Sequence, residues 1–281
     1  MKNCLVIALF LTPLLLCAQP STEVYLFDLS KEGLTTPVNI STNEGYDNQP
    51  SFWPNSQSVL YARSVDGQTE IARYFVDSKE TKIITSTLQG SEYSPTPIPG
   101  TSSISSVRLD TTGRQLLYRY NLLGESEVLV EDLKIGYHAW ISNEEIVTFV
   151  LGEPATMQVI NVRTEEAKTV GEKIGRSLHK VPNRDVFSYV DKSSAPWSIQ
   201  LMDLTTGQSS KLIEVIAGAE DYCWTANEKI LMGSGSVIYQ MNEMEGWLPF
   251  ADLKEKFEIE GNISRLSASP DGKLLAVVVA K

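Results

Sequence analysis

The sequence contains few of the residues that build disulfides and metal sites. Its 281 residues include three cysteines and two histidines. Cys4 and Cys17 lie in an apolar N-terminal segment, so Cys223 is the one cysteine in the remainder of the chain. A single cysteine forms no intrachain disulfide and no cysteine-based metal cluster. The sequence therefore predicts a protein held together by its apolar core.

Common catalytic and nucleic-acid-binding signatures are also absent. The chain has no G-x-S-x-G nucleophile elbow, and the segment Gly233–Ser236 does not supply one. Phosphate-binding loops, H-E-x-x-H and calcium-loop spacings do not occur. The formal net charge is -11 at pH 7. Nucleic acids and anionic membrane surfaces recruit proteins through basic patches, so this acidity argues against both as partners.

The N-terminus has the pattern of a cleaved export signal. Lys2 supplies a positive start, the run Leu5–Leu16 is apolar, and Ala18 precedes polar residues. The run is shorter than the ~20 residues that span a bilayer, which argues against stable membrane insertion. Lipid attachment at Cys17 fits less well, because such sites have a small residue where this chain has Leu16. We expect cleavage after Ala18, a periplasmic or secreted protein, and a single domain over residues 19–281.

A turn-centred repeat runs along the rest of the chain. Each copy has a proline or small residue next to a turn residue, immediately before an apolar run. The middle residues of the six copies are spaced 40 to 45 residues apart. This period matches a four-stranded propeller blade. The middle residues are Pro54, Pro99, Ser142, Pro182, Ala226 and Pro270.

Each turn is followed by a predicted strand and then by a predicted hairpin. The runs after the turns are short and rich in β-branched residues, as buried strands are. They lie at 58–62, 104–107, 145–150, 185–190, 230–232 and 274–278. The hairpins lie at 71–85, 117–130, 157–170, 199–213 and 237–250.

The terminal copies of the repeat are incomplete in complementary ways. Residues 263–279 contain the turn and the first two strands but no hairpin, whereas residues 23–40 contain a hairpin with no strands before it. Together they make one blade. We therefore predict an all-β fold, a six-bladed β-propeller whose closing blade is shared between the N- and C-termini. Blades arranged in a closed ring also leave few exposed sheet edges, which promote aggregation.

These repeats resemble those of TolB-type β-propellers. The segments that carry the resemblance are Phe52–Asn55, Ser269–Lys273 and Met202–Gly207. The likeness extends over about 25–279 and is closest to stand-alone exported propellers of unassigned function, through "SEYSPTP", "YHAW" and "GRSLHKVP". It implies a fold and an exported protein, and it implies no reaction. TolB has an additional domain before its propeller, so its role in an envelope complex is not carried over.

Candidate binding residues come from the segments that enter the innermost strands. In a propeller these segments converge at one mouth of the central channel. The residues just before each repeat turn are polar and of mixed charge. They are Asp47, Asn48, Gln49, Glu92, Tyr93, Tyr137, His138, Arg176, Ser177, His179, Glu220, Asp221 and Arg265.

Both histidines are among these candidates, in neighbouring blades. Imidazole together with carboxylates suits a divalent metal, and an open metal site could activate water. However, His138 is four residues before Ser142, and His179 is three residues before Pro182. Because side chains alternate along a strand, the two imidazoles should point to different sides unless a bulge corrects the offset.

The sequence therefore favours an exported binding or scaffolding module that contacts a protein or a small ligand at the channel mouth. No cofactor is predicted. The alternative is a metal-assisted hydrolase or lyase with its site at the same mouth. Trp53, Trp140 and Trp224 stand beside their repeat turns, which favours packing between blades, whereas Trp197 and Trp247 are placed more freely.

Overall fold

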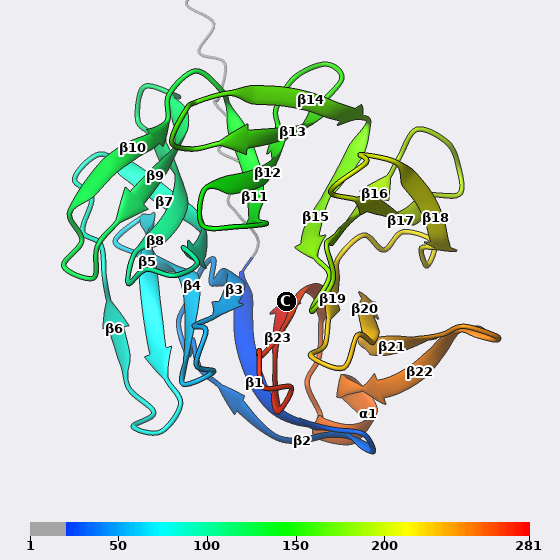
Figure 1. Cartoon of the computed structure of the whole chain (residues 1–281). Coiled ribbons are helices and arrows are strands. Elements are labelled where there is room, and N and C mark those ends of the chain that lie inside the picture. Colours follow the sequence, from blue (N-terminus) through cyan, green and yellow to red (C-terminus); the bar gives the residue numbers. More distant parts are fainter. Residues whose placement is uncertain (1–20) are drawn as a thin grey trace, which may run out of the picture.

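The computed structural model describes residues 21–281 and confirms the six-bladed propeller. Six four-stranded sheets surround a central axis, and each sheet is antiparallel (Figure 1). The signal peptide predicted at 1–18 lies outside the described residues. Among residues 21–281, no helix is both long and apolar enough to cross a membrane.

Blades 1 to 3 follow one another along the chain, each with its innermost strand first. Blade 1 contains β3 (Asn48–Phe52), β4 (Ser58–Val65), β5 (Gln68–Phe75) and β6 (Thr81–Ile83). Blade 2 contains β7 (Gly90–Pro97), β8 (Ile104–Asp110), β9 (Gln115–Tyr120) and β10 (Ser126–Val130). Blade 3 contains β11 (Ile135–Trp140), β12 (Glu145–Val150), β13 (Thr156–Asn161) and β14 (Ala167–Glu172).

Blades 4 and 5 continue this order, and blade 6 closes the ring. Blade 4 contains β15 (Ile174–Lys180), β16 (Val186–Asp191), β17 (Ser198–Asp203) and β18 (Ser209–Glu214). Blade 5 contains β19 (Tyr222–Trp224), β20 (Ile230–Ser234), β21 (Val237–Asn242) and β22 (Gly246–Asp252). Blade 6 contains β23 (Asn262–Ala268), β24 (Leu274–Ala280), β1 (Thr22–Ser30) and β2 (Gly33–Asn39).

Blade 6 is the shared blade that the sequence predicts. β1 pairs with β24 from Thr22 opposite Ala280 to Asp28 opposite Leu274, so the blue and red ends of the chain meet in one sheet (Figure 1). Lys281 Nζ reaches Glu23 Oε1 at 2.9 Å across this junction. The pairing joins the two ends of the described chain and closes the ring.

The apolar core is divided into clusters that lie between adjacent blades. For example, Leu60 and Ile71 of blade 1 pack with Ile104 and Tyr120 of blade 2. Each blade has two faces, and the residues that alternate along a strand point to opposite faces. Every blade can therefore bury apolar side chains against both neighbours, which explains why the strands read as nearly continuous apolar runs.

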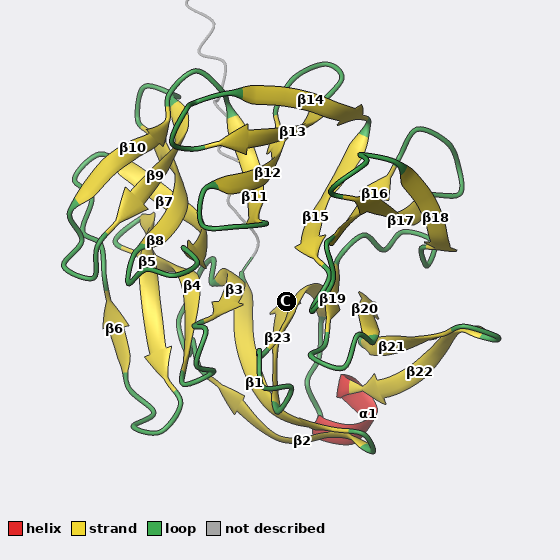
Figure 2. Cartoon of the chain, viewed as in Figure 1, coloured by secondary structure: helices red, strands yellow, loops and turns green. Residues whose placement is uncertain are grey.

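One short helix interrupts the β structure, and the sequence did not predict it. This helix, α1 (Leu253–Phe257), is the red element in Figure 2. Asp252 caps it by accepting hydrogen bonds from the backbone N–H groups of Lys254 and Glu255. Phe257 packs on Phe27 of β1 with ring centroids 5.2 Å apart. The helix therefore packs against the closing blade.

Candidate functional site

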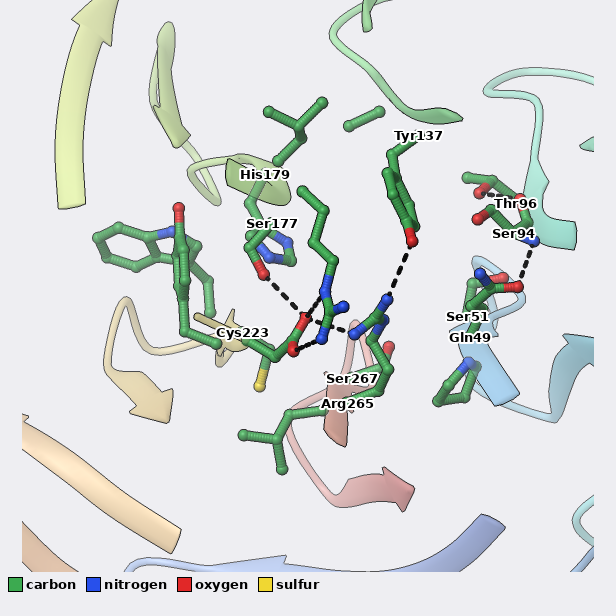
Figure 3. Close-up of a pocket in the computed structure, with 18 of the residues that line it drawn as sticks. Gln49, Ser51, Ser94, Thr96, Tyr137, Ser177, His179, Cys223, Arg265 and Ser267 are labelled. Carbon is green, nitrogen blue, oxygen red and sulfur yellow. Dashed lines mark hydrogen bonds and ion pairs between the residues drawn. The ribbon is translucent and has the colours of Figure 1, made fainter. Parts of the chain in front are cut away.

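The innermost strands surround a cavity of about 360 Å³ on the propeller axis (Figure 3). Each blade contributes one residue at an equivalent position of its innermost strand. This residue lies two positions before the residue whose backbone N–H donates a hydrogen bond across the repeat turn. We call this set the channel ring. It consists of Ser51, Thr96, Ala139, His179, Cys223 and Ser267, all of which line the cavity.

The ring is small and polar for most of its circumference. Its register is set by pairing with the second strand, with Thr96 opposite Ser105 and His179 opposite Ser188. Cys223 is the ring's most buried polarisable member, and burial raises the pKa of its thiol to about 12. The thiol therefore stays protonated and unreactive at neutral pH.

Bulges in the innermost strands turn further polar residues toward the cavity. The register of β3 shifts between Asn48 and Ser51, and that of β7 shifts between Tyr93 and Thr96. Within these bulges, Gln49 and Ser94 have φ values of 56° and 53°. Such bulges re-aim side chains. Ser94 N donates to Gln49 Oε1 at 2.8 Å, which links the two blades at the mouth (Figure 3).

A charged cluster occupies another part of the cavity wall. Asp221 accepts from Arg176 at 2.5 Å and from Arg265 at 2.7 Å, so one carboxylate bridges two guanidinium groups (Figure 3). Arg265 Nη2 also lies 3.4 Å from the Tyr137 hydroxyl. The three charged residues come from blades 4, 5 and 6. We call Arg176, Asp221, Arg265 and Tyr137 the arginine cluster.

The charge of Asp221 keeps Arg176 in its charged form. Burial opposes the charge of Arg176, but the hydrogen bond and the charge of Asp221 raise its pKa overall. Tyr46 lies near enough to feel the charges of Arg265 and Arg176, and burial raises the pKa of its phenol. Tyr46 therefore stays neutral, and it packs edge-on against Tyr93 with ring centroids 6.1 Å apart.

Glu220 forms a separate pair beside this cluster. Its Oε2 accepts from Lys192 Nζ at 2.8 Å, and its Oε1 accepts from the backbone N–H of Arg176. A Cβ at position 175 would lie 2.6 Å from Glu220 Oε1, so Gly175 makes this approach feasible. Lys192 thus offsets the charge of Glu220, although Glu220 still helps to raise the pKa of Arg176.

The two histidines point to different places, in agreement with their offset in sequence. His138 is opposite Thr148 and occupies the position equivalent to Tyr222 in blade 5, one residue away from the channel ring. Its Nε2 lies 2.7 Å from Ser105 Oγ of the preceding blade, and only 7% of the residue is exposed. Burial lowers the pKa of His138 to about 4. It serves as an inter-blade contact at the cavity edge.

His179 faces the cavity as a member of the channel ring. Its ring lies 4.7 Å from that of Tyr222, and burial lowers its pKa to about 4 despite the opposing charge of Asp221. His179 is therefore neutral at physiological pH. Within residues 21–281 its Nε2 has no hydrogen-bond partner.

The structure brings together eight of the thirteen residues proposed from the sequence. Those lining the cavity are Gln49, Tyr137, His138, Arg176, Ser177, His179, Asp221 and Arg265. The other five are not part of its lining. They are Asp47, Asn48, Glu92, Tyr93 and Glu220.

Asp47 and Glu92 are buried between blades, with no exposed surface. Asp47 Oδ1 accepts from the backbone N–H of Ser64 at 3.3 Å, and burial raises the pKa of its carboxyl to about 6. Glu92 Oε1 accepts from Arg108 and Tyr120, each at 2.9 Å. Both carboxylates therefore face the protein interior.

The sequence analysis missed several cavity residues that a finer use of the repeat would have found. Ser51, Thr96, Cys223 and Ser267 each stand three residues before the middle residue of their repeat turn, as His179 does. The sequence analysis chose polar residues near each turn and did not apply one fixed offset from the turn, so it overlooked them. The sequence analysis expected Trp197 and Trp247 to be freer to bind a ligand. In the structure both pack against the apolar cluster between blades 4 and 5.

The residues at the cavity do not fit a bound metal ion. Among residues 21–281, no three His, Cys, Asp or Glu side chains are grouped so that they could hold one. His138 Nε2 contacts Ser105, and Asp221 is shared by two arginines.

Comparison with solved structures identifies the fold. No family model and no curated protein matches the chain. A candidate TolB from Agrobacterium tumefaciens superposes with a TM-score of 0.75 at 9% identity, over 94% of this chain and 99% of that one. The fold of this chain is thus that of TolB-type propellers.

Two enzymes share the propeller fold with this chain. A gluconolactonase from Xanthomonas campestris gives a TM-score of 0.65 at 9% identity, covering 95% of this chain and 99% of its own. An oligogalacturonate lyase in complex with manganese gives 0.60 at 14% identity, covering 87% and 80%. At these identities the likeness concerns the fold alone.

Proposed function

We propose that this protein is an exported β-propeller binding module that takes a small polar ligand in the cavity at its channel mouth. One observation carries the proposal. Polar residues line much of the cavity, and three of the lining residues, Ser94, His138 and His179, each have a buried polar atom with no hydrogen-bond partner within residues 21–281.

Buried polar atoms without partners are costly, at about 1–3 kcal/mol each. Native proteins satisfy such atoms with ordered water or with a ligand. The Ser94 hydroxyl and His179 Nε2 both belong to residues that line the cavity, where a ligand could reach them. The cavity volume of about 360 Å³ falls within the usual range for small-molecule sites.

The fold comparison is compatible with a small ligand. The names of two structural neighbours, a gluconolactonase and an oligogalacturonate lyase, refer to sugar-derived substrates. The same architecture thus accommodates such molecules elsewhere. We extend only binding to this chain, because the cavity lacks a grouped set of metal-ligating side chains within the described residues.

Export is the second part of the proposal. It is supported by the sequence pattern at 1–18, with its positive start, apolar run and small residue before the expected cleavage point. Expression of the full chain in a bacterial host, followed by N-terminal sequencing of the periplasmic or secreted product, tests it. A mature protein beginning at Gln19 is expected, and an uncleaved cytoplasmic chain would contradict this part.

Binding is tested by thermal shift and calorimetry with a panel of sugars, sugar acids and short peptides. We expect at least one panel member to raise the melting temperature, because a ligand that binds only the folded state stabilises it by mass action. The variant Ser267→Tyr fills the channel ring with a bulky side chain and should abolish that shift. Ser210→Tyr makes the same substitution at an exposed position of β18 and should leave it unchanged.

Two outcomes would contradict the proposal. One is a panel in which no compound shifts the melting temperature or releases heat. The other is a compound whose binding is unaffected by Ser267→Tyr, which would place its site outside the cavity.

A further inference from the structure

We propose that the ligand of this cavity carries a single carboxylate on a small hydroxylated body, as a sugar acid does, and that Arg265 and Arg176 read that carboxylate. The inference rests on the proposed function and deepens it by naming the ligand class. It follows from the charge balance and the unused donors of the arginine cluster, together with the polar wall formed by blades 1 and 2.

The arginine cluster has one positive charge in excess. Arg176 and Arg265 together face a single carboxylate, Asp221, which contacts both of them. The neighbouring Glu220 also acts on Arg176, but it is paired with Lys192 at 2.8 Å, so these three cations and two carboxylates together keep one positive charge in excess. The excess lies in a chain whose overall charge is -11. A ligand with one negative charge would balance it.

The guanidinium groups also retain donors for a ligand. Arg176 uses Nε and Nη2 on Asp221, and Arg265 uses Nη1 on Asp221 and on the carbonyl of Ser264. The bonds of the described residues leave Arg176 Nη1 and Arg265 Nε unused. Arg265 Nη2 makes only a long contact of 3.4 Å with the Tyr137 hydroxyl. A carboxylate is the acceptor that best matches guanidinium donors, since charged hydrogen bonds are stronger than neutral ones.

Most of the arginine cluster is shielded from solvent, which strengthens its attraction for a charged ligand. The side chain of Arg265 is 15% exposed and that of Asp221 is 10% exposed, whereas that of Arg176 is 38% exposed. Attraction between charges grows as water is excluded, so the buried Arg265 should contribute more than Arg176. We therefore expect Arg265 to be the main determinant of preference for acids.

The polar wall on the other side of the cavity suits hydroxyl groups. Gln49, Ser51, Ser94 and Thr96 line it, and Figure 3 shows them apart from the arginine cluster. Gln49 Oε1 is occupied by Ser94 N, which leaves its amide N–H₂ as a donor. The Ser94 hydroxyl has no partner within residues 21–281. Neutral donors and acceptors of this kind match the hydroxyl groups of a polyol.

The test compares D-galacturonate with D-galactose, which differ at one carbon by carboxylate against hydroxymethyl. Calorimetry on the full mature chain should show galacturonate binding at least about tenfold more tightly, a difference of about 1.4 kcal/mol. Arg265→Gln should remove the preference for galacturonate. Arg163→Gln removes the same charge from an exposed residue on another surface and should keep the preference.

A second variant keeps the test decisive if Arg265→Gln does not fold. Arg265→Lys retains the charge but loses the fork of donors, so it should keep a reduced preference for galacturonate. Raising the salt concentration on the wild-type protein should weaken galacturonate binding and spare galactose binding.

Failure of this inference is distinguishable from failure of the proposed function. Equal affinities for galactose and galacturonate, both abolished by Ser267→Tyr, would overturn the inference and leave the binding function standing. Binding of a short peptide through its free C-terminus, with no binding of either sugar, would overturn the ligand class. An absence of any binding across the panel would overturn both.

Discussion

Trp140 of blade 3 donates its indole N–H to Ser105 Oγ of blade 2 at 2.8 Å. The same relationship recurs two blades later, where Trp224 donates to Ser188 Oγ at 2.8 Å. In each case a tryptophan of the innermost strand reaches the second strand of the preceding blade. This repeated contact confirms that the tryptophans beside these two repeat turns pack between blades.

Loss of the Trp140 bond should destabilise the ring. We expect Ser105→Ala to cost about 1–3 kcal/mol, because it leaves the buried indole N–H of Trp140 unpaired. Trp140→Phe should cost a similar amount, because it loses this bond and part of the buried indole, although Ser105 Oγ keeps its contacts with His138 and Thr96. The double variant should cost less than the sum, as residues in direct contact are coupled. Urea unfolding of the four proteins measures this. Trp247→Phe is a matched control, because its indole N–H bond to Glu214 O is exposed and should contribute little. If the costs of Ser105→Ala and Trp140→Phe simply add in the double variant, the contact between the two residues is contradicted.

Acidification should destabilise the protein through His138. Burial holds its folded-state pKa at about 4, below the usual value of about 6.5 in the unfolded chain. Between these values the unfolded state binds more protons, so stability falls as pH drops from about 6.5 toward 4, by up to about 3 kcal/mol for this residue. Urea unfolding at several pH values should give a shallower loss for His138→Gln. Parallel profiles for the two proteins would contradict a buried neutral imidazole.

Asp47 should have the opposite pH dependence. Burial raises its folded-state pKa to about 6, so the ionised carboxylate opposes folding above that pH, and stability increases as pH falls through 6 toward 3.8. Asp47→Asn, which removes the charge, should therefore stabilise the protein at pH 8 by up to about 3 kcal/mol and less at pH 5. Thermal unfolding at the two pH values checks this. A variant that is less stable at pH 8 would show that the carboxylate is well accommodated there.

The closing blade should be essential for folding. Deletion of residues 274–281 removes β24, which lies between β23 and β1 and buries Leu275, Val277 and Val278 completely. We expect a chain without this strand to lack cooperative unfolding, as measured by circular dichroism and proteolysis. Deletion of Lys281 alone is the control: its ion pair with Glu23 involves a side chain that is 54% exposed, so the cost should be below about 1 kcal/mol.

The repeat was readable from the sequence because it depends on local chemistry. Each turn before a second strand needs its own turn residues, and each second strand needs an apolar run, wherever the blade stands in the ring. Gly100 and Gly272 illustrate this, each with a φ of 72° at the turn before the second strand of its blade. Helix α1 escaped prediction because its five residues are too few to show a helical period.

The sequence also predicted that the two histidines point in different directions, but it did not predict which residues they contact. Counting from the turns predicted that His138 and His179 point apart, and the register agrees. Sequence counting did not reveal that His138 meets Ser105, which is 33 residues away in the neighbouring blade. Contacts across blades depend on how the sheets pack, and no local pattern encodes them.

The sequence by itself determined the blades, their number and the shared closing blade, because a period of turns and apolar runs repeats along the chain. Only the tertiary structure decided which polar residues meet at the cavity. Asp221 lies 45 residues from Arg176 and 44 from Arg265, and it bridges them only once three blades are assembled. Asp47 comes two residues before Gln49, yet Asp47 is buried between blades and Gln49 lines the cavity. The physical reason is the bulge at Gln49, which re-aims one side chain without a signature in the repeat.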